Sequence, residues 1–241
     1  MRIKNYIPNF ITLMNLFSGI LSVYFSMTGD LRLAGFLIFL AAVFDFFDGM
    51  AARLLNAKTT IGADLDSLAD VVSFGVAPGF ILFQMIRLSL GQEFIPVENP
   101  GYLPFAGFVI PLLGALRLAK FNVDVEQTDS FKGLPIPAQA IVIASFPIIV
   151  LSCFADNPNF YSELISNTWF LMGSGLVLSL LMVSDIPMFS LKFGSFSWGE
   201  NQMRYMFLIM SVFLIIILKM AAIPIIILLY LLLSLVFYRT K

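Results

Sequence analysis

The stretch FDFFDGMAARLLNAKTTIGADLDSLAD, residues 44–70, places regularly spaced aspartates inside otherwise apolar sequence. At about 100° per residue of an α-helix, Asp45 and Asp48 share one face of a helix. Asp66 and Asp70 are four positions apart and share a face of the next helix. If the two helices form a hairpin, two carboxylates from each helix, four in all, converge on one volume. A cluster of that kind needs cations to offset its charge.

The composition indicates a membrane protein that works through carboxylates. Of the 241 residues, 59% are hydrophobic and 12% are charged, whereas soluble domains are nearer roughly one quarter charged. The single cysteine, Cys153, excludes an internal disulfide, and there is no histidine. Without histidine, a Ser-His-Asp triad and the commonest zinc sites are excluded. Acid–base chemistry therefore falls to aspartate and glutamate.

Apolar runs separated by short polar segments predict an all-α polytopic membrane protein with about eight transmembrane helices. The first run is longer than a signal-peptide core and no cleavage site follows it, so we expect an uncleaved span. The last run, 205–238, is too long for one crossing, and Lys219 with Pro224 divides it. Trp198 is expected in the preceding loop as an interfacial aromatic. The expected spans are 7–27, 33–55, 63–88, 103–121, 138–154, 168–183 and the two halves of 205–238.

The lysines and arginines are unevenly divided between the two sides of this predicted topology. If the N-terminus is inside, the inner side holds Arg2, Lys4, Arg53, Lys58, Arg117, Lys120, Lys132, Lys192, Arg204, Arg239 and Lys241. The outer side holds Arg32, Arg87 and Lys219. The positive-inside rule therefore predicts both termini, and the hairpin within 45–70, on the cytoplasmic side. No organelle-targeting segment is visible, which favours the cell membrane of a prokaryote.

The aspartates belong to a longer pattern, D-x2-D-G-x2-A-R-x8-G-x3-D-x3-D, which is complete in this chain. Its fixed positions are Asp45, Asp48, Gly49, Ala52, Arg53, Gly62, Asp66 and Asp70. The pattern resembles the signature of the CDP-alcohol phosphatidyltransferases. The resemblance implies a six-helix membrane core within residues 1–200, with the active site in 45–70. It leaves residues 201–241 as a C-terminal hairpin of two helices.

Three further segments resemble the branch of this family that uses serine as the acceptor alcohol. They are DSLADVVSFGVAPG from Asp66, ALRLAKFNVD from Ala115 and KGLPIPA from Lys132, and the resemblance weakens after about residue 140. It implies transfer of the phosphatidyl group from CDP-diacylglycerol to the hydroxyl of L-serine, giving phosphatidylserine and CMP. It also implies a homodimer in the lipid bilayer and no nucleic-acid partner.

The acidic cluster suggests a site for divalent cations. Four unpaired carboxylates at membrane depth would cost roughly 10–14 kcal/mol. Mg²⁺ or Mn²⁺ takes carboxylate oxygens, and two such ions can clamp a displacement at phosphorus. The resemblance implies two ions, with Asp70 also acting as the catalytic base, and the ligands Asp45, Asp48, Asp66 and Asp70. The alternative is a structural network in which the acids pair with Arg53 and Lys58.

The small motif residues Gly49, Ala52 and Gly62 have two interpretations. Small residues commonly permit close packing of membrane helices. The resemblance implies instead that they leave room for the cytidine and diphosphate of the CDP-lipid, while Arg53 pairs with phosphate oxygens. For Gly62, packing or a helix start stays open beside substrate contact.

Arg117, Lys120 and Lys132 are candidates for binding the serine carboxylate or a lipid phosphate. The ordinary explanation of Arg117 and Lys120, one turn apart at a helix end, is snorkelling and interaction with the helix C-terminus. Two other functions stay open. One keeps the transferase site with another acceptor, such as glycerol 3-phosphate or an inositol phosphate. The other is a cation-coupled transporter, against which the complete motif and the position of the acids near one interface both argue.

Overall fold

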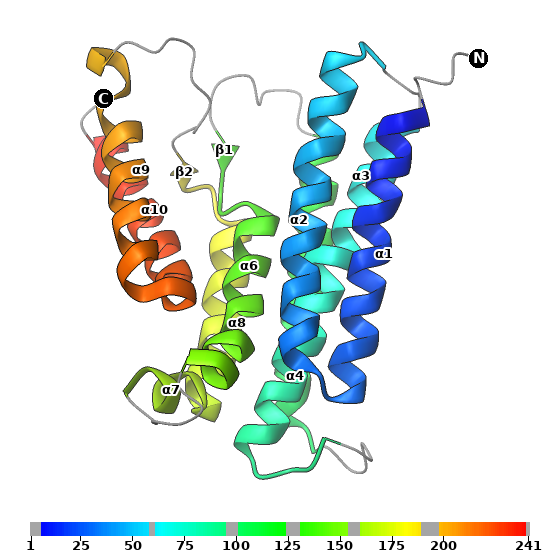
Figure 1. Cartoon of the computed structure of the whole chain (residues 1–241), viewed down its shortest axis with the longest axis vertical. Coiled ribbons are helices and arrows are strands. Elements are labelled where there is room, and N and C mark those ends of the chain that lie inside the picture. Colours follow the sequence, from blue (N-terminus) through cyan, green and yellow to red (C-terminus); the bar gives the residue numbers. More distant parts are fainter. Residues whose placement is uncertain are drawn as a thin grey trace.

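The computed structural model describes residues 6–57, 61–94, 101–123, 131–153, 160–188 and 198–239. They form an upright bundle of helices (Figure 1). The first half contains α1 (Tyr6–Thr28), α2 (Leu31–Leu54), α3 (Gly62–Asp70), α4 (Ala77–Ser89) and α5 (Val109–Val123). The second half contains α6 (Ile136–Ile148), α7 (Phe160–Ile165), α8 (Thr168–Val183), α9 (Trp198–Leu218) and α10 (Ala222–Arg239).

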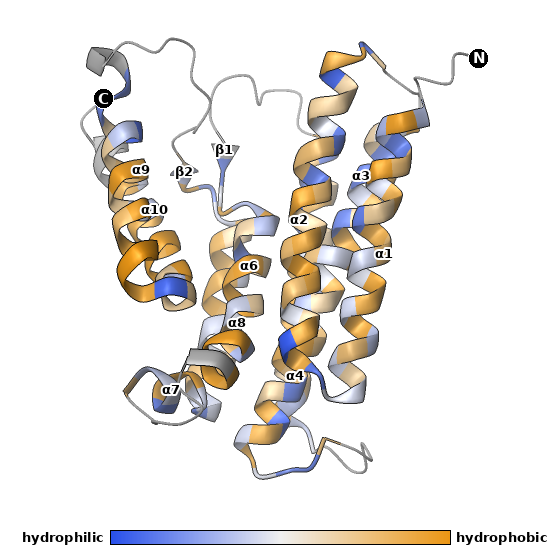
Figure 2. Cartoon of the chain, in the orientation of Figure 1, coloured by the Kyte–Doolittle hydropathy of each residue, from blue (hydrophilic) through white to orange (hydrophobic). Residues whose placement is uncertain are grey.

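The predicted membrane architecture is confirmed. Five segments are long and apolar enough to cross a bilayer: Tyr6–Thr28, Leu31–Leu54, Gly62–Ser89, Leu103–Val123 and Asn201–Leu235. Ile136–Leu151 and Thr168–Val183 are shorter apolar helices. Lys219 has a positive φ of 51° and divides the last segment into α9 and α10, as its sequence predicts. The protein is therefore a multi-pass, all-α membrane protein, and its ribbon is dominated by apolar residues (Figure 2).

Helix α1 shows how the bundle is built for a membrane. Its outward face carries large apolar side chains such as Phe10, Phe17 and Tyr24. Its inward face is small and polar, and the buried residues of this helix are Pro8, Thr12, Asn15, Ser18, Gly19, Ser22 and Ser26. In a bilayer, polar side chains favour the protein interior, where they find hydrogen-bond partners. Each end of this stripe reaches a neighbouring helix, and Ser22 Oγ donates to the carbonyl of Ala34 on α2 at 2.8 Å.

Helices α3 and α4 form one continuous rod from Gly62 to Ser89, joined by a π-helical turn, η2 (Val71–Val76). Helix α1 crosses this turn very closely. A Cβ on Gly19 would lie 2.7 Å from the Cα of Ser73, and Ser73 Oγ donates to the carbonyl of Asn15 at 3.0 Å. The π-turn begins directly after Asp70, and such turns occur frequently at functional sites.

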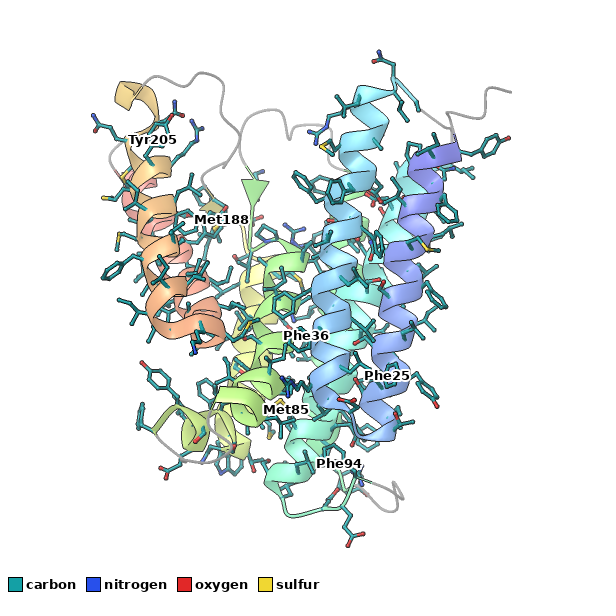
Figure 3. The ribbon with its side chains drawn as sticks, in the orientation of Figure 1. Phe25, Phe36, Met85, Phe94, Met188 and Tyr205 are labelled. Carbon is teal, nitrogen blue, oxygen red and sulfur yellow. The ribbon has the colours of Figure 1, made fainter. Side chains whose placement is uncertain are left out.

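The second half of the chain differs from the prediction in small details. Residues expected in loops form α7 and a two-stranded antiparallel pair, β1 (Phe131–Lys132) with β2 (Pro187–Met188). Trp198 begins α9 and does not lie in a loop. Helix α10 packs on α6 and β2, and α9 packs on α10; a small cluster of Leu134, Met188, Phe207 and Tyr230 joins them. Figure 3 labels Met188 beside these helices.

Helix α1 begins and helix α10 ends at the same end of the bundle, where the end of α2, the start of α3 and the two strands also lie (Figure 1). The opposite end carries the turn between α1 and α2, the C-terminus of α4 and α7. This arrangement agrees with an even number of crossings. Five cations of the predicted inner side, Arg2, Lys4, Lys58, Lys192 and Lys241, lie outside the described residues.

Candidate active site

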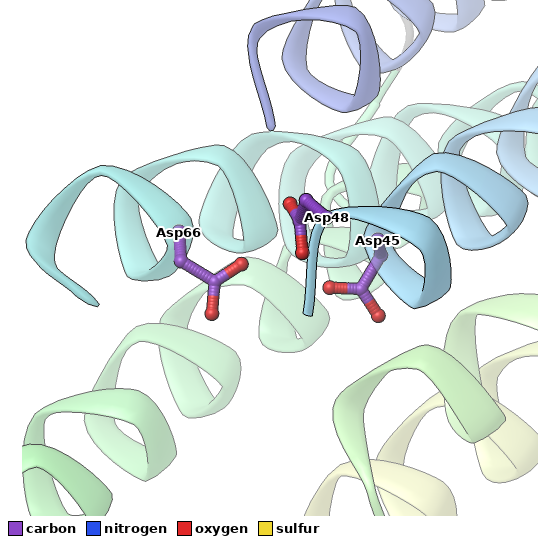
Figure 4. Close-up of side chains that lie close together, drawn as sticks. All are labelled: Asp45, Asp48 and Asp66. Carbon is purple, nitrogen blue, oxygen red and sulfur yellow. The ribbon is translucent and has the colours of Figure 1, made fainter. Parts of the chain in front are cut away.

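Three of the four motif aspartates that the sequence predicts to converge lie together. One carboxylate oxygen from each of Asp45, Asp48 and Asp66 lies within 4.8 Å of the other two. Asp45 and Asp48 come from the C-terminal half of α2, and Asp66 comes from the middle of α3 (Figure 4). Asp48 is buried, with 7% of its surface exposed. The helical hairpin therefore assembles an acidic cluster from residues that are 18 to 21 positions apart in the motif.

Asp70 lies one helical turn beyond Asp66 and outside this group of three. It is 8% exposed, and Asn15 Nδ2 donates to its Oδ1 at 3.3 Å. Its carboxylate interacts electrostatically with Asp45 and Asp66, so it belongs to the same electrostatic site. Its contact with Asn15 holds it at the point where α1 crosses the π-helical turn. The structure thus gives Asp70 surroundings that differ from those of the other three.

The polar stripe of α1 supplies partners that the motif does not contain. Thr12 Oγ1 donates to Asp48 Oδ2 at 2.7 Å, just as Asn15 donates to Asp70. Neither contact is visible in the motif spacing. The available signal is the spacing of Thr12 and Asn15, which places both on the small, polar face of a helix that is otherwise apolar. That face predicts orientation toward the bundle interior but not the partner.

The donor set fits a divalent cation. Carboxylate oxygens are the ligands that Mg²⁺ and Mn²⁺ prefer, and Asp66 Oδ1 is buried without a hydrogen-bond partner among the described residues. A structural ion-pair network is not favoured, because Arg53 is exposed and its Nε donates to the carbonyl of Gly49 on its own helix. Lys58 lies outside the described residues. The acidic cluster could therefore bind metal.

A pocket of about 330 Å³ opens beside the cluster. Its walls come from the start of α1, the end of α2 and the start of α3, and they comprise Pro8, Asn9, Thr12, Asp48, Gly49, Ala52, Ala57, Gly62, Ala63 and Asp66. All three small residues of the motif line it. A Cβ placed on Gly49 would meet nothing within 4 Å, so this glycine does not serve helix packing. Arg53 is not among the lining residues.

The predicted acceptor cations lie together around a second pocket of about 90 Å³. Arg117 and Lys120 reach it from α5 and Lys132 from β1, and the remaining lining residues are Phe121, Met182, Val183, Ser184 and Asp185. Arg117 Nε donates to the carbonyl of Met182 at 3.1 Å and so caps the end of α8. Arg117 also interacts electrostatically with Asp70. The two pockets share no lining residue.

Comparison with known proteins agrees with this geometry. The sequence model of the CDP-alcohol phosphatidyltransferase family matches residues 5–181, which continues past the segments that carry the closer resemblance. A CDP-diacylglycerol–serine O-phosphatidyltransferase of Helicobacter pylori is 36% identical over 181 residues, covering 74% of this chain and 70% of the relative. The protein of that name from Bacillus subtilis is 38% identical over 148 residues, covering 59% of this chain and 76% of the relative.

An archaeal relative, the archaetidylserine synthase of Methanothermobacter thermautotrophicus, is 36% identical over 182 residues. That alignment covers 75% of this chain and 68% of the relative. The matched region contains α1 to α8 almost entirely, and with them the acidic cluster and the larger pocket, whereas Met182 to Asp185 of the smaller pocket lie just beyond it. With the full motif in place and its residues gathered at one site, the chain belongs to the CDP-alcohol phosphatidyltransferase family.

Proposed function

We propose that this protein transfers the phosphatidyl group from CDP-diacylglycerol to L-serine, giving phosphatidylserine and CMP. The observation that carries the proposal is the acidic cluster of Asp45, Asp48 and Asp66, set beside a pocket lined by the small residues of the same motif. The acceptor follows from the relatives in bacteria and archaea, whose names specify serine phosphatidyl transfer or archaetidylserine synthesis.

The reaction is a single displacement at phosphorus. Asp70 accepts the proton of the serine hydroxyl, and the serine oxygen forms a bond to the phosphorus that carries diacylglycerol. The bond from that phosphorus to the bridging oxygen breaks, and CMP leaves with the electron pair. The contact of Asn15 with Asp70 Oδ1 leaves the other carboxylate oxygen for the proton. No covalent enzyme intermediate is required.

Asp45, Asp48, Asp66 and Asp70 would hold two divalent cations, Mg²⁺ or Mn²⁺. When bound, such ions neutralise diphosphate charge and stabilise the departing phosphate. The protein's own contribution is to fix the carboxylates. Thr12 orients Asp48, and the helical hairpin sets the distance between α2 and α3. Positioning of ligands by neighbouring hydrogen bonds is a general requirement of metal sites.

The larger pocket would hold the cytidine and diphosphate of the CDP-lipid. Gly49, Ala52 and Gly62 leave its floor without bulky side chains, so a ligand can approach the backbone. Arg53 is exposed beside the pocket, and its guanidinium can pair with phosphate oxygens once a ligand is present. Arg117, Lys120 and Lys132 around the smaller pocket would bind the carboxylate of serine.

The proposal includes an orientation and an assembly. The positive-inside rule places both termini and the active site at the cytoplasmic face of the cell membrane, where CMP can leave into water. Residues 1–200 form the transferase domain and 201–241 the added hairpin. By analogy with the family, the protein is a homodimer.

The first experiment measures CMP release from CDP-diacylglycerol by the purified protein with Mg²⁺ or Mn²⁺. Serine, glycerol 3-phosphate and inositol phosphate are offered separately. We expect serine-dependent release, and we expect Asp70→Asn to lower it about 100- to 10,000-fold, because it removes the general base.

Each other outcome corrects a different part of the proposal. Release with another acceptor would keep the mechanism and overturn serine as substrate. Near wild-type release by Asp70→Asn would remove the base assignment. No release with any acceptor would favour the transporter, which ion-dependent uptake into proteoliposomes without CDP-lipid would test.

A further inference from the structure

We propose that Asp185 makes the smaller pocket selective for a zwitterionic acceptor and against phosphorylated alcohols. This inference rests on the proposed function. It adds the side chain that distinguishes serine from phosphorylated acceptors such as glycerol 3-phosphate. Asp185 is not part of the family motif, and the sequence alone gives no reason to single it out. Its significance comes from the pocket that the fold builds around it.

The pocket combines three cations with one acid. Arg117, Lys120 and Lys132 line it together with Asp185 and the hydroxyl of Ser184. The acid forms no ion pair with these cations within the part of the chain that the structure describes. Asp185, Lys120 and Lys132 are exposed, whereas Arg117 is half-buried. A ligand entering this pocket therefore meets three cations and one carboxylate that has no ion-pair partner among the described residues.

The backbone fixes Asp185 close to Lys132. Lys132 pairs with Pro187 in the two-stranded ladder, and the amide of Gly133 donates to the carbonyl of Ile186 at 2.8 Å. Gly133 has a φ of +73°, and a Cβ there would lie 2.7 Å from the carbonyl oxygen of Ser184. Only glycine allows so close an approach of β1 to the end of α8. Backbone pairing and close packing thus hold this wall of the pocket in place.

One side chain of the pocket also interacts with the proposed base. Arg117, which lines the pocket, interacts electrostatically with Asp70. The end of α5 is tied to α3 by Asn122 Nδ2, which donates to Ser67 Oγ at 3.0 Å. Ser67 stands between Asp66 and Asp70 on that helix. The wall of the pocket is therefore connected to the helix that carries Asp66 and Asp70.

The charges match those of a free amino acid. A carboxylate pairs with Arg117 or a lysine, and an ammonium group donates to Asp185 through charge-assisted hydrogen bonds. The volume of about 90 Å³ is about six to nine times the ~10–15 Å³ that one water requires, which suits a small polar molecule. Glycerol 3-phosphate lacks an ammonium group and carries more negative charge. Asp185 would repel it, and repulsion of the wrong ligand is an effective source of specificity.

The test compares Asp185→Asn with wild-type protein in the CMP-release assay. The serine KM should rise about tenfold, because one charge-assisted contact is lost, while the KM for CDP-diacylglycerol should stay within about twofold. Glycerol 3-phosphate, added as a competitor, should inhibit serine-dependent release more strongly in the variant. General damage to the fold would weaken the binding of both molecules and would not produce this gain.

Two further variants complete the design. Asp185→Glu keeps the charge and should recover most of the serine KM, and Glu163→Gln removes an exposed acid at the other end of the bundle and should change nothing. An unchanged serine KM in Asp185→Asn, or an unchanged response to glycerol 3-phosphate, overturns the role of Asp185 and leaves the proposed function intact. Wild-type protein that releases no CMP with serine overturns both.

Discussion

The charged groups at the two ends of the helical rod from Gly62 to Ser89 differ in how well the protein satisfies them with hydrogen bonds. At the far end, Arg87 is 2% exposed, and its guanidinium donates to Gln84 Oε1, Gln92 Oε1 and the carbonyls of Glu93 and Phe94. Figure 3 labels Phe94 at this end, below α4. At the near end, three carboxylates crowd together and Asp66 Oδ1 has no hydrogen-bond partner among the described residues.

The difference separates structural from functional polar groups. A buried charge that the protein surrounds with hydrogen-bond partners has much of its desolvation cost offset by the fold itself, so it needs no ligand. A buried carboxylate that lacks hydrogen-bond partners and has like-charged neighbours destabilises the metal-free protein. A bound cation removes that cost. The charge of Arg87 thus finds its partners within the protein, whereas the acidic cluster needs a bound ligand to offset its charge.

Away from the acidic site, two buried side chains in the described part of the chain have unsatisfied polar atoms but belong to neither class. Gln139 on α6 and Ser179 on α8 are fully buried, and both have side-chain atoms with no hydrogen-bond partner among the described residues. Neither carries a charge, and nothing in the structure explains them. An unsatisfied polar atom therefore indicates a ligand site only where it belongs to a charged group that lines a pocket, as it does at Asp66.

The largest effect on activity should come from removing one carboxylate from the acidic cluster. Asp66→Asn removes one oxygen donor from the cluster, and we expect CMP release to fall more than about 100-fold because the metal site loses a charged ligand. The metal-free variant should melt at the same temperature as wild-type protein or higher, since repulsion among the acids is reduced. Thermal unfolding in detergent checks the second point.

A readout independent of activity sharpens this prediction. Mn²⁺ should raise the melting temperature of wild-type protein, because a ligand that binds only the folded state stabilises it. The same titration should leave Asp66→Asn nearly unchanged. An equal Mn²⁺ response in both proteins would mean that the cluster is not where the cation binds.

The opposite end should respond in stability and not in catalysis. Arg87→Leu leaves the buried side chain of Gln84 and the carbonyls of Glu93 and Phe94 without their donor, which should cost about 3 kcal/mol of unfolding free energy. CMP release per folded molecule should stay within about twofold of wild type, since the active site is at the other end of the rod.

Arg32→Gln is the matched control, because Arg32 is exposed at the same end of the bundle. Its stability should change by less than about 0.5 kcal/mol. If Arg87→Leu were as stable as Arg32→Gln, the hydrogen bonds of Arg87 would contribute nothing and the contrast between the two ends would fail.

The sequence was sufficient for the spans and for the acidic cluster, but not for the partners across helices. Helical spacing predicts which face a residue lies on, so the convergence of Asp45, Asp48 and Asp66 could be foreseen. Which residue of another helix meets that face depends on crossing geometry, and the contacts of Thr12 and Asn15 were therefore missed.

Two other features were beyond the reach of pattern analysis. Arg87 was counted only as an outer-side charge, because its partners lie in a loop whose path the sequence does not specify. The strands β1 and β2 have two residues each, too few to show any periodicity. The pocket containing Asp185 depends on that pairing, so it could not be anticipated either.

Gly19 and Gly49 differ in the space that an added methyl group would find. A Cβ on Gly19 would lie 2.4 Å from Ser73 Oγ and 2.7 Å from Ser73 Cα, whereas one on Gly49 would meet nothing within 4 Å. Gly19→Ala must therefore push α1 away from the π-helical turn, which should cost about 1–3 kcal/mol of stability.

The same displacement should weaken the contact of Asn15 with Asp70, so Gly19→Ala should lower kcat while leaving the KM for CDP-diacylglycerol near its wild-type value. Gly49→Ala should do the reverse. Its stability should rise by up to about 1 kcal/mol, because alanine favours the helix over glycine, and its methyl group enters the pocket and should raise the KM for CDP-diacylglycerol several-fold. Kinetics and melting curves of the two variants decide the matter, and a Gly49→Ala protein with unchanged KM would mean that the open space beside the acids is not where the nucleotide binds.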